Sequence, residues 1–184
     1  MRVKADYKRV LQQLNLVTER LLINRYCALG AANQSIPNND LYKSIKMLLT
    51  PNVVKSLPEY FQNVSTDKAA QAWLDTINQE GELLLIRSKT EHELIGCIFM
   101  HEATADIVHI GYLFAEHHWG KGFAKESLSR LIDTLSASSS SLTLIAGVER
   151  NNVASIKLLS ILGFKLNIDN QSEALFYQLS LNNS

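Results

Sequence analysis

The stretch His117–Ala124 constrains the fold more than any other segment, because two close glycines separate an apolar run from an amphipathic pattern. Residues 110–114 before it predict a strand. The apolar residues after it share one face of a predicted helix: Ala124, Leu128, Leu131 and Leu135. Such a loop presents backbone N–H groups at the positive end of a helix, where a phosphate or diphosphate can bind. Positions 120 and 122 favour glycine because a Cβ there would hinder close approach of the backbone to a ligand.

Two familiar glycine motifs do not fit this loop. A P-loop requires G-x-x-x-x-G-K-[ST], which the segment lacks. A dinucleotide-binding fingerprint requires a third glycine three residues after Gly122, where Lys125 stands. The pattern therefore indicates a diphosphate site of another kind.

The bulk composition predicts an ordinary soluble domain. The 184 residues include 46% hydrophobic and 20% charged residues, and the 18 basic residues equal the 18 acidic ones. This balance gives no support to nucleic-acid binding, and no apolar run has the length of a membrane span. Cys27 and Cys97 show no metal-ligand spacing, so we expect packed thiols in a reduced, cytoplasmic protein.

The order of predicted elements favours an α+β fold with a central, mostly antiparallel, twisted sheet of six or seven strands and flanking helices. The chain is expected to form a single domain over 1–184, with residues 1–16 as an N-terminal helical extension that packs on its own domain. A dimer contact through that helix is the alternative. The predicted strands are 21–23, 83–87, 94–100, 105–114, 142–148, 164–168 and 174–181, and the helices include 41–49, 53–60, 66–79 and 152–162. A β-α-β crossover is predicted around the glycine loop.

Three segments, with the I-G-Y before the loop, resemble the GNAT superfamily of acetyl-CoA-dependent N-acetyltransferases. His117 to Ala124 is similar to the family's Q/R-x-x-G-x-G/A signature, in the W-G-K-G-[FY]-A form of its RimJ/RimL-like branch. Asn152 to Ile156, followed by Leu162-Gly163-Phe164, is similar to the N-x-x-S-I…L-G-F segment of that branch. Thr18-Glu19-Arg20-Leu21 resembles its T-E-R-L strand, and Ile110-Gly111-Tyr112 its I-G-Y.

The resemblance implies acetyl-CoA as co-substrate and an amine as acceptor. It implies that the strand ending at Tyr112, Leu113 and Phe114 splays from strand 142–148 and offers its backbone to the pantetheine amides. Asn152 and Ser155 would face the pantetheine arm or the thioester. Lys121 would attract phosphate or be a solvated loop lysine. The backbone N–H groups that would hold the pyrophosphate belong to Trp119, Gly120, Lys121, Gly122, Phe123 and Ala124.

The resemblance assigns the acid–base chemistry less directly. Acetyl transfer needs a neutral amine and a stabilised leaving thiolate. His109 stands where relatives often place a glutamate, and a histidine can accept a proton at neutral pH. Relatives carry a tyrosine as thiolate acid where this chain has Leu159, and many carry a glutamate where it has Gly147. Ser155 or a water would then replace the acid.

The sequence leaves two acceptors possible, a protein N-terminus and a small-molecule amine. Residues 26–63 are expected to shape the side of the site where the acceptor binds. A non-catalytic acyl-CoA-binding module is the alternative function, and a polyamine- or antibiotic-modifying enzyme a further one. No metal is expected: His101-Glu102 fails the H-E-x-x-H pattern at Ala105, and the adjacent histidines His117 and His118 rarely chelate one ion together.

Overall fold

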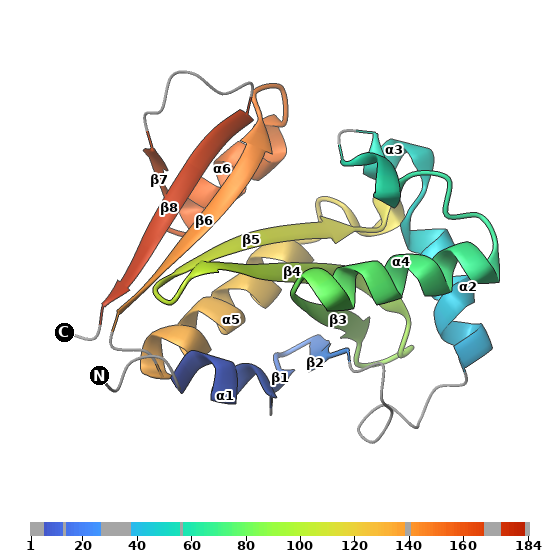
Figure 1. Cartoon of the computed structure of the whole chain (residues 1–184), viewed down its shortest axis with the longest axis horizontal. Coiled ribbons are helices and arrows are strands. Elements are labelled where there is room, and N and C mark those ends of the chain that lie inside the picture. The colour runs from blue at the N-terminus through green and yellow to red at the C-terminus, as the bar shows by residue number, and fades with distance from the viewer. Residues whose placement is uncertain are drawn as a thin grey trace.

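The computed structural model describes residues 6–12, 14–26, 38–55, 57–138, 141–167 and 174–182 (Figure 1). In the described part, no helix is both long and apolar enough to cross a membrane. The strands are β1 (Asn15–Val17), β2 (Leu21–Arg25), β3 (Glu82–Ser88), β4 (Leu94–Thr104), β5 (Ile107–Phe114), β6 (Ser141–Glu149), β7 (Lys165–Asn167) and β8 (Ala174–Asn182). The helices are α1 (Asp6–Gln12), α2 (Asn38–Leu48), α3 (Pro51–Val54), α4 (Asp67–Glu80), α5 (Phe123–Ser138) and α6 (Val153–Ile161), with 3₁₀ turns η2 (Glu59–Phe61) and η3 (Glu116–His118).

The strands form one eight-stranded sheet in the order β1-β2-β3-β4-β5-β6-β8-β7. Every neighbouring pair is antiparallel except β5 and β6, which are parallel and joined through α5. This arrangement confirms the predicted mixed α/β fold and the β-α-β unit around the glycine loop. The sequence pattern missed β1, because three residues are too few to show an alternating period.

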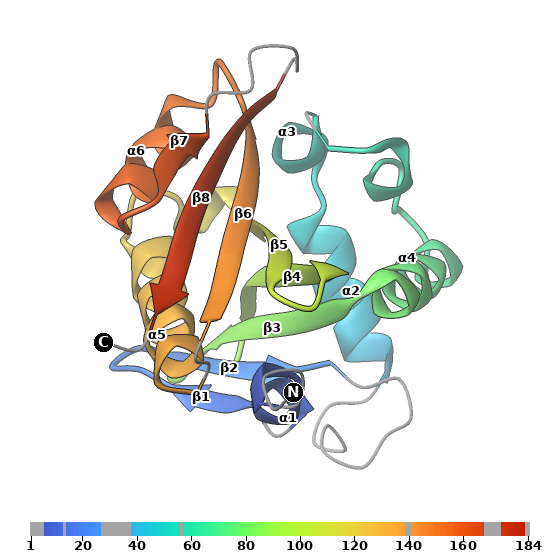
Figure 2. The same ribbon diagram turned by 60° about the vertical axis from the view of Figure 1, so that its left-hand side comes forward.

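Two apolar cores cover the two faces of the sheet (Figure 2). One lies under α1, α5 and α6 and includes Leu128, Leu131 and Leu159. The other lies under α2, α3 and α4 and includes Ile45, Trp73 and Leu74. Side chains of β5 alternate between them, which fixes the face to which each of its residues points.

The helix predicted over 53–60 is wrong. Pro51 occupies the first turn of α3, which ends at Val54, and Pro58 has extended backbone before η2 begins. A proline disfavours helical backbone at the residue before it, so the second proline interrupts the helix. The predicted stop at Gly163 is confirmed, since its φ of 88° lies in the left-handed region. The low-complexity loop around Ser138–Ser141 and the end of the predicted strand 164–168 lie partly outside the described residues.

The parallel strands β5 and β6 separate along their length. They pair only at Ile107–Thr143, Val108–Leu144 and His109–Ile145. From Ile110 to Phe114, β5 has β4 as its one strand neighbour in the described sheet, and Figure 1 shows β6 turning away. The predicted splay between these strands is thereby confirmed, and it opens the sheet at its centre.

Candidate active site

A cavity of about 830 Å³ occupies the opening between β5 and β6. Its walls come from the segment before α4, the end of α4 and start of β3, the middle of β4 and of β5, the end of β6, α6 with its N-cap, and the first residue of β8. The polar side chains on these walls are Tyr60, Glu80, Glu82, His101, Tyr112, Glu149, Asn152 and Ser155. A pocket of this size has room for the arm of a cofactor and a small acceptor group.

The glycine loop lies between η3 and α5. Gly120 and Gly122 have φ of 71° and 81°, a conformation that side chains with a Cβ rarely adopt. The first backbone hydrogen bond of α5 runs from the Glu126 N–H to the Gly122 carbonyl at 3.0 Å. The N–H groups of Phe123, Ala124 and Lys125 therefore have no partner within the helix, and they lie at its positive end.

Arg20 and Glu126 hold the loop from outside. The Arg20 Nε donates to Glu126 Oε2 at 2.7 Å, its Nη1 donates to the Lys121 carbonyl at 3.0 Å, and its guanidinium lies 4.3 Å from the ring centre of Phe123. Thr18 Oγ1 donates to the same carboxylate at 2.5 Å. Partial burial raises the pKa of Glu126, but the hydrogen bonds from Thr18 and Arg20 and the charge of Arg20 outweigh that effect and lower it. The carboxylate is thus a fixed charge, and it tethers the β1–β2 turn to the loop.

The two long side chains of the loop differ in their contacts: Trp119 is hydrogen-bonded to β5, and Lys121 is exposed to solvent. The indole of Trp119 is half-exposed and its Nε1 donates to the Phe114 carbonyl at 2.7 Å. One of the three β5 residues predicted to serve the pantetheine arm is therefore already engaged through its carbonyl. Lys121 is exposed, so its ammonium is accessible to an anion at the loop.

Asn152 and Ser155 meet at the start of α6. Asn152 is the N-cap, and its side-chain oxygen accepts from the Ser155 N–H at 3.1 Å. Both residues line the cavity, as the sequence predicts. Leu159, one turn further along, is buried in the core and also borders the cavity.

Tyr112 brings a buried phenol from β5 to the same place. Its hydroxyl is shielded from solvent and has no hydrogen-bond partner of good geometry among the described residues. Burial raises the pKa of Tyr112, and the nearby Ser155 hydroxyl opposes part of that rise. A neutral O–H at the cavity wall that lacks a well-formed hydrogen bond gains free energy when a ligand supplies an acceptor.

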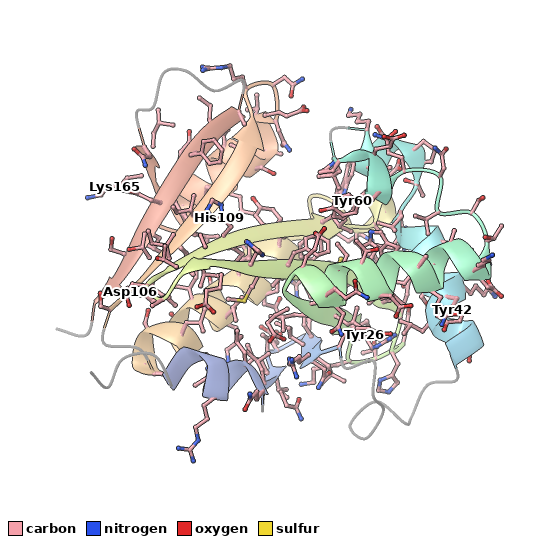
Figure 3. All side chains as sticks on the ribbon, in the orientation of Figure 1. Tyr26, Tyr42, Tyr60, Asp106, His109 and Lys165 are labelled. Carbon is pink, nitrogen blue, oxygen red and sulfur yellow. The ribbon has the colours of Figure 1, made fainter. Side chains whose placement is uncertain are left out.

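His109 and His101 form a cross-strand pair in the β4–β5 register. Figure 3 shows His109 near the line where β5 and β6 still meet. His109 is half-buried and is absent from the cavity walls, whereas His101 lines the cavity. The His101 Nδ1 lies 2.6 Å from the Glu80 carbonyl oxygen, which can only accept, so Nδ1 carries the proton. In neutral His101 the lone pair is therefore on Nε2.

The wall of the cavity formed by the 57–61 segment and α4 is acidic and aromatic. Of residues 26–63, expected to shape the acceptor side, Leu57, Pro58, Tyr60 and Phe61 line the cavity, and residues 27–37 and 56 lie outside the described part. The Tyr60 hydroxyl donates to Glu80 Oε2 at 3.3 Å. Burial and the charge of Glu80 raise the pKa of Tyr60, which stays a neutral donor. Tyr60 is labelled in Figure 3. Glu82 is paired with Arg25.

The family model described as "Acetyltransferase (GNAT) domain" matches residues 38–165. The chain belongs to the GNAT acetyltransferase family. An uncharacterized N-acetyltransferase of Bacillus licheniformis, p20, is 36% identical over 109 residues, which cover 57% of this chain and 61% of that protein. The match thus spans about three fifths of the length of this curated relative.

Solved structures share the GNAT fold. A GNAT-family acetyltransferase of Bacillus anthracis superposes with a TM-score of 0.71 at 18% identity, over 90% of this chain and 98% of that one. The yncA protein of Salmonella typhimurium, solved with its cofactor acetyl-CoA, superposes with a TM-score of 0.60 at 18% identity, over 89% and 95% of the two chains. At these identities the structural matches support the fold alone.

Several residues of the GNAT site escaped prediction from the sequence. His101, Tyr60 and Glu80 reach the cavity from β4, η2 and α4, and no local motif marks them. Tyr112 was expected to act through its backbone, and the structure adds its buried hydroxyl. Glu19 of the T-E-R-L motif is exposed in the β1–β2 turn and does not line the cavity.

Proposed function

We propose that the chain transfers an acetyl group from acetyl-CoA to a primary amine by direct attack on the thioester. The observation that carries this proposal is the opening between β5 and β6. The glycine loop follows β5, and the carboxylates of Glu80 and Glu149 lie on the walls of the cavity in this opening. The loop amides would hold the pyrophosphate, and the free edge of β5 would pair with the pantetheine amides. The thioester would then lie beside Tyr112 and Ser155.

The charge of the cavity favours an amine as acceptor. Glu80, Glu82 and Glu149 are the charged carboxylates on its walls, and no lysine or arginine lies among the lining residues. Such a field concentrates cations, and amines arrive in solution as ammonium ions. Glu82 already pairs with Arg25, which leaves Glu80 and Glu149 as the carboxylates for an incoming ammonium.

The ammonium must lose a proton before it can attack. We infer that the Nε2 of His101 accepts it, because the Glu80 carbonyl fixes the tautomer in which Nε2 carries the lone pair, and His101 lines the cavity. His109, predicted from the family position, is the competing candidate and lies one strand away. Substituting each histidine separately distinguishes them.

The leaving thiolate needs a donor where Leu159 replaces the usual tyrosine of α6. The Tyr112 hydroxyl is the donor that we propose, with Ser155 beside it. Its proton would pass to sulfur as the C–S bond breaks, and the attacking nitrogen would lose its second proton to water as the C–N bond forms. The phenolate left behind would be reprotonated from solvent in each cycle.

The RimJ/RimL-like motifs favour a protein N-terminus as acceptor over a free small molecule. The test is release of CoA thiol with a panel of N-terminal peptides, polyamines and amino acids. Turnover on peptides supports the proposal. Binding of acetyl-CoA with no turnover on any amine would favour the non-catalytic acyl-CoA-binding module instead.

A further inference from the structure

A cluster of three potential metal ligands lies outside the cavity, just before the glycine loop. It consists of Glu93, His117 and His118, whose ligand atoms all lie within 4.8 Å of one another. His117 Nε2 is 3.0 Å from Glu93 Oε1, and His118 Nε2 is 3.2 Å from Glu93 Oε2. Among the described residues it is the one such group of three.

The sheet brings these residues together. In the β4–β5 ladder Gly96 is opposite Phe114, and the Ala115 N–H donates to the Ile95 carbonyl at 3.0 Å beyond that pair. Glu93 immediately precedes β4, and His117 and His118 lie in η3, which follows β5. The pairing of β4 with β5 thus brings the three residues to one place, although 24 residues separate Glu93 from His117 in the chain.

The two imidazoles are held in place on their other sides. The ring of His118 packs edge-on against Phe123 at 5.6 Å between centroids, and its side chain is 12% exposed. The His117 ring lies 4.1 Å from that of His118 and is 55% exposed. One histidine is fixed by packing and the other borders solvent, so an ion can enter and keep a water in a further position.

The ligand set selects the kind of ion. Two imidazole nitrogens and one carboxylate suit Zn²⁺ or a similar borderline metal, and they do not suit Mg²⁺ or Ca²⁺, which prefer oxygen. Bonds of about 2.0–2.1 Å at tetrahedral angles place ligand atoms roughly 3.3 Å apart. Each nitrogen lies near this spacing from one oxygen of Glu93, His117 at 3.0 Å from Oε1 and His118 at 3.2 Å from Oε2, and one ligand atom of each residue lies within 4.8 Å of the other two.

We propose that Glu93, His117 and His118 form a Zn²⁺ site that fastens the β3–β4 turn to the glycine loop. Adjacent histidines rarely chelate one ion together, but here Glu93 offers a third ligand that nothing in the local spacing indicates. A bound ion would replace the two hydrogen bonds to the carboxylate by direct coordination. It would restrict the segment that enters Gly120 without contacting the cavity.

The test uses the untagged full chain with ZnCl₂ alone, by isothermal titration, and with CoCl₂, by visible absorption. We expect one equivalent of Zn²⁺ to bind and Co²⁺ to give tetrahedral d–d bands. Glu93→Gln and His117→Asn should each weaken Zn²⁺ binding at least tenfold. His92→Asn is the matched control, because His92 is exposed in the same turn with a φ of 56° that asparagine tolerates.

No stoichiometric binding to the wild-type chain would overturn the proposal, as would equal affinity in all three variants. In either case the cluster is a hydrogen-bonded ion pair, and Glu93→Gln would lower the melting temperature without changing any response to Zn²⁺. These binding and melting experiments use neither acetyl-CoA nor an acceptor. Their outcome is therefore separate from that of the proposed acetyl transfer.

Discussion

Arg20 and Glu126, 106 residues apart in the chain, form an ion pair of 2.6 Å between Nη2 and Oε2 at the back of the glycine loop. The T-E-R segment of the first strand region thus has a structural purpose: its threonine and arginine hold the first turn of α5. The same guanidinium reaches the Lys121 carbonyl at 3.0 Å. The T-E-R segment and the glycine loop, far apart in the sequence, thus belong to one network of contacts in the fold.

Arg20→Ala should therefore loosen the loop. The lost contacts to Glu126 and to the Lys121 carbonyl leave the loop amides less ordered before a ligand arrives, so acetyl-CoA should bind about three- to tenfold more weakly. Titration calorimetry with acetyl-CoA measures this. Arg9→Ala, on the distant α1, is the control and should leave affinity unchanged. Equal affinity in both variants would show that the loop needs no support from Arg20.

Glu126 makes stability depend on pH. Its pKa is lower in the folded chain than its ordinary value of 4.5, so the stabilisation is complete above 4.5 and is lost as pH falls through the folded value. Glu126→Gln should cost about 1 kcal/mol at pH 7, since Arg20 is 43% exposed and water screens the pair. For a domain of this size that lowers the melting temperature by roughly 2–4 °C.

Melting curves of wild type and Glu126→Gln between pH 7 and the acid limit check this expectation. The difference should shrink as the wild-type carboxylate is protonated. A difference that stays constant with pH would mean that the variant acts through packing and not through the charge.

Tyr112→Phe removes the buried hydroxyl and keeps the ring. If this hydroxyl protonates the leaving thiolate, kcat should fall roughly ten- to hundredfold, while the affinity for acetyl-CoA changes little. Tyr177→Phe is the matched control, because Tyr177 is also buried and does not line the cavity. An equal fall of kcat in both variants would show that the effect comes from altered packing. Full activity of Tyr112→Phe would show that Ser155 or water protonates the thiolate.

The two histidines of the β4–β5 pair give a direct comparison. His101→Asn preserves a donor for the Glu80 carbonyl but lacks the Nε2 lone pair, and we expect kcat to fall at least tenfold with unchanged cofactor binding. His109→Ala should have the smaller effect, since His109 is absent from the cavity walls. The rate of CoA release with the best acceptor measures both effects. A larger fall of kcat in His109→Ala than in His101→Asn would show that His109 is the base.

The sequence predicted the local structure around the glycine loop. The strand, the Gly120–Gly122 loop and the α5 face are contiguous, so local pattern and glycine chemistry are enough to place them. Asn152 and Ser155 follow for the same reason, because an N-cap and its third residue are fixed by helix geometry.

The acceptor half could not be predicted in this way. Tyr60, Glu80 and His101 meet only because η2, α4 and β4 converge on the opening between β5 and β6. Their spacing in the chain carries no period and no motif. The same holds for Glu93, which meets His117 because the pairing of β4 with β5 brings together the segments before and after them.

The central claim is that the glycine loop binds the diphosphate of acetyl-CoA, and a calorimetric titration of Gly122→Val tests it most directly. Valine at φ 81° is strained and would crowd the loop amides, so affinity should fall at least a hundredfold. Gly163→Ala is the control: it has a similar φ of 88° at the end of α6, costs about 1 kcal/mol of stability, and should bind normally. Wild-type affinity in a folded Gly122→Val chain would contradict the account.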